Sequence, residues 1–246
     1  MVRSLFRTSL FAGLLFAVSA ASAQQITGQS RSVRAYATSY EPFFDNITYT
    51  DEEKDSTAAA GDYNKTASAK AASFTNDYGT GTATQTSNVD AAANTFEGFG
   101  TADADVATRY GADSTGLATS TMEVRFTLDE EGELELNGYL FAQGGDYNQG
   151  TGPAPENVYA SIEVIDVGRG GVTVFSRIAQ IGPGSTMDPF TGISSREVAV
   201  DSVIGLEQGT YKVVITAFAD TDNGRDPNTA IVPFAEFDVY GVIYQF

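Results

Sequence analysis

The sequence contains no histidine and no cysteine among its 246 residues. Without histidine, a Ser-His-Asp triad, an imidazole general base and imidazole metal ligands are excluded. Without cysteine, the chain has no thiol nucleophile, no disulfide and no cysteine-ligated structural zinc. Because these common catalytic and metal-binding arrangements are closed to it, we predict a protein that is not an enzyme.

Positive charge is also scarce, with 14 Lys and Arg against 32 Asp and Glu and a net charge of −18. The first 23 residues hold two arginines and no acid, so the remainder carries 12 basic and 32 acidic residues, or −20. Such a surface repels phosphate backbones, which excludes nucleic acid as a partner, and it disfavours anionic membranes. Calcium, a cationic partner or solubility alone are all compatible with this charge.

The N-terminus has the features of a cleavable signal peptide, residues 1–23. Arg3 and Arg7 form a positive segment, residues 10–18 are apolar, and Ala21-Ser22-Ala23 gives a small-x-small cleavage site before Gln24. The apolar run is too short for a bilayer core of ~30 Å, which takes about 20 residues. We therefore expect export to an extracytoplasmic location, secreted or at the cell surface, with the periplasm and the outer membrane also open.

Residues 119–246 alternate between apolar and polar side chains with a period of two. Met122, Val124, Phe126 and Leu128 share one face, and 134–140 repeat the pattern after an acidic turn at 129–132. This predicts a β-hairpin. Turn-forming residues separate the further strands that the pattern predicts, at 158–167, 172–181, 195–204, 211–219 and 234–244.

Residues 24–118 have a different composition. Strands are predicted at 33–40 and 46–50, whereas 56–118 consist mainly of Ala, Thr, Ser, Gly and Asp. Small side chains bury little apolar area, so this segment cannot hold a core alone. We expect it to form strands that pair with the main sandwich, because aromatic residues recur along it: Phe74, Tyr78, Phe96, Phe99 and Tyr110. The expected fold is all-β, a single jelly-roll-like β-sandwich after a cleaved signal peptide.

Two stretches of the C-terminal half carry a family resemblance. The run Ser120-Thr121-Met122-Glu123-Val124-Arg125-Phe126-Thr127-Leu128 with the turn that follows, and the later Leu206-Glu207-Gln208-Gly209-Thr210-Tyr211-Lys212-Val213, resemble the β-sandwich ectodomains of secreted bacterial PEP-CTERM-type proteins. The sorting tail of that family is not in this sequence. The same stretches are similar to bacterial pre-peptidase C-terminal domains. Both resemblances imply an exported bacterial sandwich and neither implies a specific activity.

A polar loop at 220–228 is a candidate calcium site. It follows a predicted strand and offers oxygen ligands from Asp220, Asp222, Asp226 and Asn228, and calcium takes six to eight oxygens. The loop lacks the EF-hand pattern, because Gly224 stands at the fifth ligand position. An ordinary polar turn has the same residue types, so both interpretations stay open.

Two further alternatives concern carboxylates and the chain end. Glu133 with Glu135, and Glu236 with Asp238, could supply the carboxyl pair of a glycoside hydrolase. The last residues, ending in Phe246, resemble the closing strand of an outer-membrane β-barrel, which would place the protein in a membrane.

A flat aromatic surface is the remaining candidate for a binding site. Without tryptophan, it would be built from tyrosine and phenylalanine, and Tyr139 and Phe141, with Tyr147 and Tyr159 near the following loop, are the candidates. The same rings could instead pack inside the sandwich. The leading hypothesis is an exported, non-enzymatic β-sandwich of the cell surface or extracellular matrix, with a structural role or binding a polysaccharide or surface protein.

Overall fold

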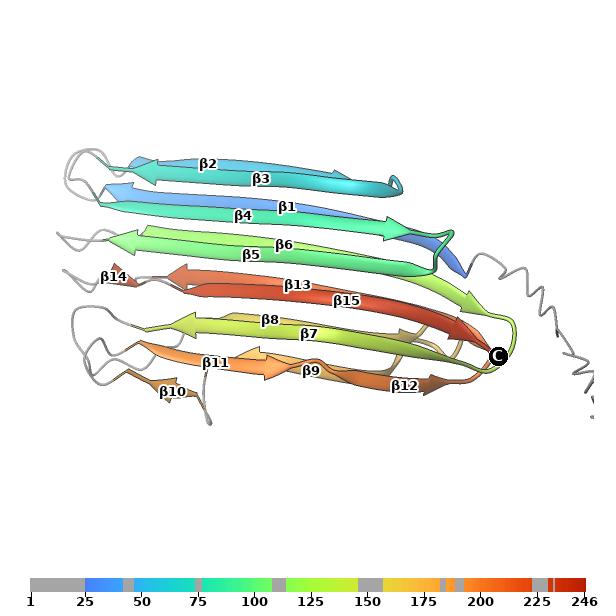
Figure 1. Ribbon diagram of the computed structural model, residues 1–246. Helices are drawn as coiled ribbons and strands as arrows, with labels where there is room; N and C mark the ends of the chain where they lie inside the picture. Colours follow the sequence, from blue (N-terminus) through green and yellow to red (C-terminus); the bar gives the residue numbers. More distant parts are fainter. Residues whose placement is uncertain are drawn as a thin grey trace, which may run out of the picture.

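The computed structural model describes residues 25–41, 47–73, 77–107, 114–145, 157–181, 185–188, 193–222, 230–231 and 233–246. These residues form two antiparallel sheets that stack face to face (Figure 1). The predicted all-β sandwich is confirmed. The predicted signal peptide, 1–23, lies outside the described residues. No helix in the described ranges is long and apolar enough to cross a membrane.

The six-stranded sheet has the strand order β2-β1-β6-β13-β8-β9. Its strands are β1 (Ile26–Glu41), β2 (Ile47–Thr57), β6 (Ser114–Leu128), β8 (Val158–Asp166), β9 (Val172–Gln180) and β13 (Gly209–Asp222). A bulge between Ile26 and Gly28 interrupts the pairing of β1 with β6, and a second one, next to Val164, interrupts the pairing of β8 with β9.

The nine-stranded sheet has the order β10-β11-β7-β15-β5-β4-β3, with β12 paired to β7 and β14 paired to β5. Its strands are β3 (Gly61–Ala72), β4 (Tyr78–Asp90), β5 (Thr95–Ala107), β7 (Gly132–Gly144), β10 (Thr186–Met187), β11 (Ser194–Ala199), β12 (Ser202–Leu206), β14 (Ala230–Ile231) and β15 (Phe234–Gln245). The small-residue segment therefore supplies β3, β4 and β5, and β5 pairs directly with β15 near the end of the chain.

The chain passes repeatedly from one sheet to the other, so that strands close in sequence lie in opposite layers. β2 packs on β3, β5 on β6, and β7 on β8 (Figure 1). The predicted hairpin between 122–128 and 134–140 is wrong for this reason. β6 belongs to the six-stranded sheet and β7 to the nine-stranded sheet. A hairpin and a sheet-crossing turn both keep Leu128 and Leu134 buried, so alternation alone cannot distinguish them.

The predicted strand 195–204 is divided into β11 and β12, which both pair with β7. Between them Val200 is fully buried, and its N–H donates to the carbonyl of Gly138 at 2.9 Å. Gly138 has a φ of 136°, a conformation that suits glycine, and a Cβ there would lie 1.9 Å from the carbonyl oxygen of Asp238. The backbone at Gly138 therefore contacts β15 at Asp238 and also binds Val200, the residue between β11 and β12.

The size of the buried side chains between the two sheets changes along the strands. At one end, which we call the narrow end, glycines of β4 and β6 bring the backbones of the two sheets into contact. A Cβ atom at Gly79 would lie 2.1 Å from the carbonyl oxygen of Thr115, and a Cβ atom at Gly81 would lie 2.2 Å from the carbonyl oxygen of Leu117. Alanines such as Ala102, Ala118 and Ala219 fill the adjoining layers. At the other end, the wide end, the buried side chains are large: Phe96, Val124, Phe126, Leu128, Leu134, Leu136, Val213 and Ile243.

Candidate functional site

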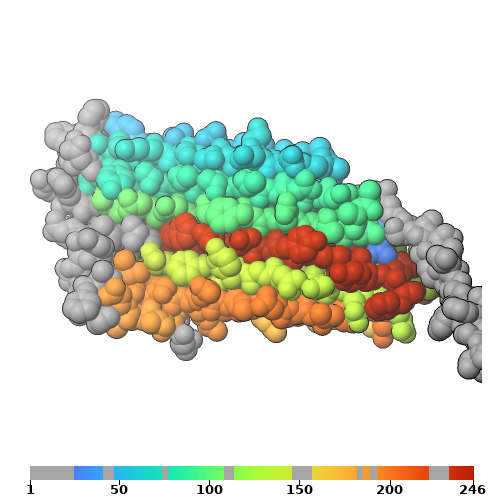
Figure 2. Space-filling view, viewed as in Figure 1, coloured from blue at the N-terminus to red at the C-terminus, as the bar shows by residue number. Residues whose placement is uncertain are grey.

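The outer face of the nine-stranded sheet carries a cluster of aromatic side chains, which we call the aromatic face. Alternation along β5, β7 and β15 directs every second side chain away from the core. Figure 2 shows this side of the molecule, with β15 in red between β5 and β7. The aromatic face comprises Phe99, Tyr139, Phe141, Phe234, Tyr240 and Tyr244.

Strand register places carboxylates between these rings. Along one row across the sheet, Tyr139 of β7 lies opposite Asp238 of β15, which lies opposite Phe99 of β5. In the adjacent rows, Glu236 lies between Phe141 and Thr101, and Tyr240 lies beside Glu97. Side chains that are directly opposite in such a ladder have Cβ atoms about 4.5–5.5 Å apart. On this face, aromatic rings and hydrogen-bond-accepting carboxylates are therefore direct neighbours across the strands.

Hydrogen bonds hold part of the face in place. The Tyr139 hydroxyl donates to the Glu236 carboxylate, and the Tyr244 hydroxyl donates to Oε2 of Glu135 at 3.2 Å. The hydrogen bond to Glu236 raises the pKa of Tyr139 to about 12, so this phenol stays protonated near neutral pH. Asn137 adds a second donor to Glu135, at 3.0 Å. Two carboxylates of the face are thus oriented before any ligand arrives.

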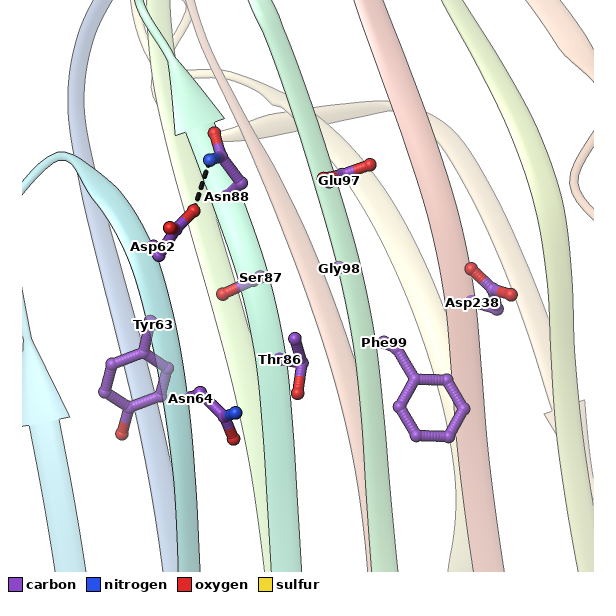
Figure 3. A pocket seen from close by; sticks show the side chains of 10 residues that line it. All are labelled: Asp62, Tyr63, Asn64, Thr86, Ser87, Asn88, Glu97, Gly98, Phe99 and Asp238. Carbon is purple, nitrogen blue, oxygen red and sulfur yellow. Dashed lines mark hydrogen bonds between the residues drawn. The ribbon is translucent and has the colours of Figure 1, made fainter.

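A hollow of about 370 Å³ lies on the same outer side, towards β3 (Figure 3). Its outward-facing lining includes Asp62, Asn88, Glu97, Phe99 and Asp238, and Asn88 is hydrogen-bonded to Asp62 at 2.5 Å. Figure 3 shows Glu97 extending from β5 towards β15, where Asp238 is located. The hollow therefore resembles the aromatic face in composition, because it places the ring of Phe99 among carboxylate and amide side chains.

Threonines make the part of the face over β4 low and regular. Thr80, Thr82, Thr84 and Thr86 all point outwards, and Thr84 is hydrogen-bonded to Thr101 of β5 at 2.6 Å between their hydroxyl oxygens. Beside them on β5, burial followed by repulsion from Asp105 raises the pKa of Asp103, while burial also raises that of Asp105. This part of the face thus combines a row of threonine hydroxyls with two partly buried carboxylates, whose ionised forms a hydrogen-bond donor would stabilise.

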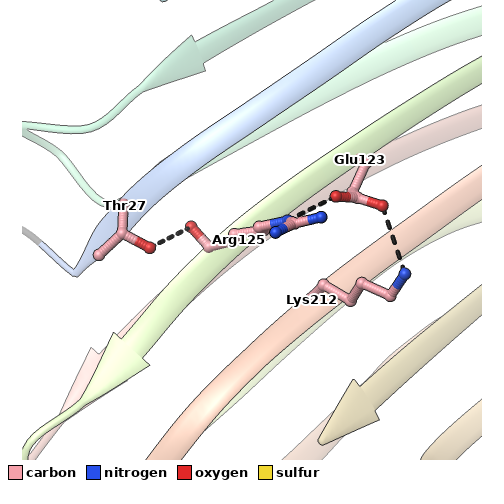
Figure 4. A network of polar contacts seen from close by, with 4 residues as sticks. All are labelled: Thr27, Glu123, Arg125 and Lys212. Atoms are coloured by element: carbon pink, nitrogen blue, oxygen red, sulfur yellow. Dashed lines mark hydrogen bonds and ion pairs between the residues drawn. The ribbon is translucent and has the colours of Figure 1, made fainter. Parts of the chain in front are cut away.

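The outer face of the six-stranded sheet is different, because some of its charges are internally paired. Glu123 accepts a hydrogen bond from Arg125 at 2.6 Å and forms an ion pair with Lys212 at 3.4 Å (Figure 4). Partial burial acts to raise the pKa of Glu123, but the Arg125 hydrogen bond and the Lys212 charge outweigh it and lower that pKa. By contrast, Glu135 and Glu236 on the aromatic face accept hydrogen bonds from uncharged groups, the hydroxyls of tyrosines and the amide of Asn137.

The structure separates the predicted aromatic residues. Tyr139 and Phe141 lie on the aromatic face, whereas Tyr159 lies in β8 on the outer side of the other sheet, stacked on Phe218 with ring centroids 5.2 Å apart. Tyr159 therefore cannot contribute to the same surface. Tyr147 lies outside the described residues.

The candidate calcium loop is only partly described. Asp220 and Asp222 lie in the last three residues of β13, and Asp226 and Asn228 lie outside the described residues. Within the described ranges no group of three or more His, Cys, Asp or Glu side chains is arranged to hold a metal ion. Calcium at this loop stays a prediction.

Both predicted carboxylate pairs lie on the outer side of the nine-stranded sheet. Glu133 and Glu135 are on β7, and Glu236 and Asp238 are on the neighbouring β15. Two further rings lie close to them: Phe99, which the sequence analysis named only as an anchor of the small-residue segment, and Tyr240, which it did not name. Tyr240 could have been found from alternation, since it shares its parity along β15 with Glu236 and Asp238. The position of Phe99 beside these carboxylates could not be found in this way, because its partner on β15, Asp238, is 139 residues away in sequence.

Comparisons with known proteins add little to this geometry. No protein-family model matches the sequence, and no curated protein matches it. Among solved structures, the fold is similar to chains of infectious bursal disease virus, from the Gt strain at 13% identity and a TM-score of 0.22 and from the Gx strain at 12% and 0.19. The matches cover 89% and 90% of this chain but 63% and 66% of the viral chains, less than two thirds of their length. At these scores the likeness carries no argument about function.

Proposed function

We propose that the protein is an exported, non-enzymatic β-sandwich of the cell surface or extracellular matrix that binds a polysaccharide on its aromatic face. The observation that carries the proposal is the register of β7, β15 and β5, which alternates rings with carboxylates across the outer face of the sheet. Aromatic rings offer apolar surface to the C–H faces of sugars, and carboxylates accept hydrogen bonds from sugar hydroxyls. An extended polymer matches an open sheet face better than a small ligand does, because small ligands favour deep cavities.

The charge of the chain narrows the class of polysaccharide. With a net charge of −18 and several carboxylates on the face itself, a polyanion such as alginate is repelled. We therefore favour a neutral polymer, or one of amino sugars, whose ammonium groups the carboxylates attract. The hydrogen bonds that already orient Glu135 and Glu236 reduce the ordering cost of binding.

Co-sedimentation with insoluble cellulose, insoluble chitin and alginate beads tests the proposal. We expect retention on cellulose or chitin and none on alginate. Phe99→Ala and Tyr240→Ala remove rings that are 39% and 42% exposed, so both variants should fold normally. Each should weaken binding by about tenfold or more, as truncation of a central aromatic contact does.

Tyr159→Ala is the matched control, because it removes a ring from the opposite outer face. It should bind as the unaltered protein does. Retention that survives both Phe99→Ala and Tyr240→Ala, or that is lost equally in Tyr159→Ala, would contradict the placement of the site. Product released from the same polymers, at a rate abolished by Glu135→Gln, would overturn the non-enzymatic assignment in favour of a glycoside hydrolase.

A further inference from the structure

One row of outward-facing side chains crosses five neighbouring strands of the nine-stranded sheet. From β7 to β3, the register places in this row Tyr139, Asp238, Phe99, Thr86 and Asn64. Because neighbouring strands lie about 4.7–4.9 Å apart, the two strands that carry the rings are about 9.5 Å apart, and the whole row is about 19 Å long. The row therefore presents two separate aromatic rings with one strand between them.

The end of the row towards β3 leads into the hollow of about 370 Å³ (Figure 3). Phe99, Thr86 and Asn64 all line it, and Thr86 stands between the other two as the shortest side chain of the three. The hollow therefore follows the row from the ring of Phe99 towards the amide of Asn64. A ligand that extends along the row meets rings over β7 and β5 and polar side chains over β4 and β3.

We propose that a linear β-1,4-linked polysaccharide crosses the strands along this row, with every second sugar on the ring of Tyr139 or Phe99 and the next part of the chain in the hollow. This inference rests on the polysaccharide-binding function proposed above and narrows its substrate class. In a β-1,4-linked chain each sugar is flipped over relative to its neighbour, so the same sugar face recurs at every second unit. That repeat is close to the spacing of the two ring-bearing strands, whereas an α-1,4-linked chain curves away from such a row.

The other rings of the aromatic face do not offer a second row of this kind. Phe141 and Phe234 contact each other, with ring centroids 6.2 Å apart and planes tilted by 56°, so they form one apolar patch in place of two. Tyr240 and Tyr244 both point outwards from β15, four residues apart, which corresponds to about 13 Å along a strand. A chain that ran along β15 would therefore not place equivalent sugar faces on both tyrosines.

Calorimetric titration of the full chain with defined oligosaccharides tests this path. Cellohexaose and chitohexaose are both β-1,4-linked, and the tighter-binding of the two should bind at least about tenfold more tightly than maltohexaose, whose linkage is α-1,4. It should also bind at least about tenfold more tightly than the trimer of the same sugar, since a trimer that spans the two rings does not reach the hollow.

Variants on β3 test the hollow end of the row. Asn64→Ala truncates an exposed side chain and should weaken binding of the β-1,4-linked hexamer by about fivefold or more, and that of the trimer by less. Ser68→Ala is the matched control, because Ser68 is exposed on the outer side of the same strand but lies outside the row. It should bind the hexamer and the trimer as the unaltered protein does.

The same titrations separate failure of the path from failure of the proposed function. Equal affinity for the β-1,4-linked hexamer and maltohexaose would overturn the path and leave polysaccharide binding standing. So would a larger loss of hexamer binding from Tyr244→Ala than from Asn64→Ala, since the polymer would then run along β15. No binding of any of these oligosaccharides would overturn both proposals.

Discussion

The narrow and wide ends of the sandwich are built from the same strands with different side chains. In β6, Gly116 and Ala118 lie at the narrow end, and Phe126 and Leu128 lie at the wide end. In β15, Ala235 and Ile243 mark the same change. Sheets in proteins usually pack about 10 Å apart. At the narrow end, small residues stabilise the fold by letting the two backbones meet, whereas at the wide end the large side chains fill the space between the sheets.

The largest effect should come from adding volume at the narrow end. Gly81→Val would place its Cβ 2.2 Å from the Leu117 carbonyl oxygen, a backbone atom that cannot rotate away. We expect a loss of about 4 kcal/mol or more in the free energy of unfolding, measured by urea titration. Gly205→Ala is the control, since nothing lies within 4 Å of its Cβ position, and its stability should be nearly unchanged. Equal stabilities for the two variants would show that the sheets are not in contact at this end.

Removing volume at the wide end should have the next largest effect. Leu136 is fully buried, so Leu136→Ala should lower the free energy of unfolding by about 2–5 kcal/mol. Val203→Ala on the neighbouring β12 truncates a side chain that is 65% exposed and should cost well under half of that. Calorimetric melting temperatures compare the two. A loss for Leu136→Ala no greater than that for Val203→Ala would mean that the wide end is not the main apolar core.

The smallest effect should come from the charges outside the wide end. Because Arg125 and Lys212 lower the pKa of Glu123, its ionised form stabilises the fold. This contribution is complete above the pKa of the unfolded chain, about 4.3, and is lost as the pH falls through the lower folded-state pKa. Glu123→Gln should therefore cost about 0.5–1 kcal/mol at pH 7 and nothing below the folded-state pKa. A stability difference that is the same at both pH values would exclude this ion pair as its source.

The sequence predicted the elements that alternation determines. The pattern of Met122, Val124 and Phe126 placed β6 and its buried face correctly, and β8, β9, β13 and β15 begin and end within a few residues of their expected ranges. The turn after Leu128 was misread, because alternation reports which face of a strand is buried but not which strand is its neighbour. The role of Gly79 and Gly81 was missed for the same reason, since their contacts are with residues in another sheet.

The candidate site could be found from the sequence only within single strands. Tyr139 and Phe141 were selected correctly, and the even positions of 234–244 predict that Tyr240 shares a face with Glu236 and Asp238. Nothing in the sequence states that β15 lies between β5 and β7, and this order is what brings Phe99 beside Asp238. Tyr159, grouped with Tyr139 on sequence proximity alone, belongs to the opposite surface.

Binding at the aromatic face can be tested most directly by amide chemical-shift mapping of the ¹⁵N-labelled protein with cellohexaose and chitohexaose. The polysaccharide-binding proposal predicts concentration-dependent shifts that are concentrated in β5, β7 and β15, around Phe99, Tyr139 and Tyr240. Residues on the outer side of β8 and β13, including Tyr159, should not shift. Shifts confined to β8, β13 or the β9 edge, or no shift with either oligosaccharide, would contradict the proposal that this face binds sugar polymers.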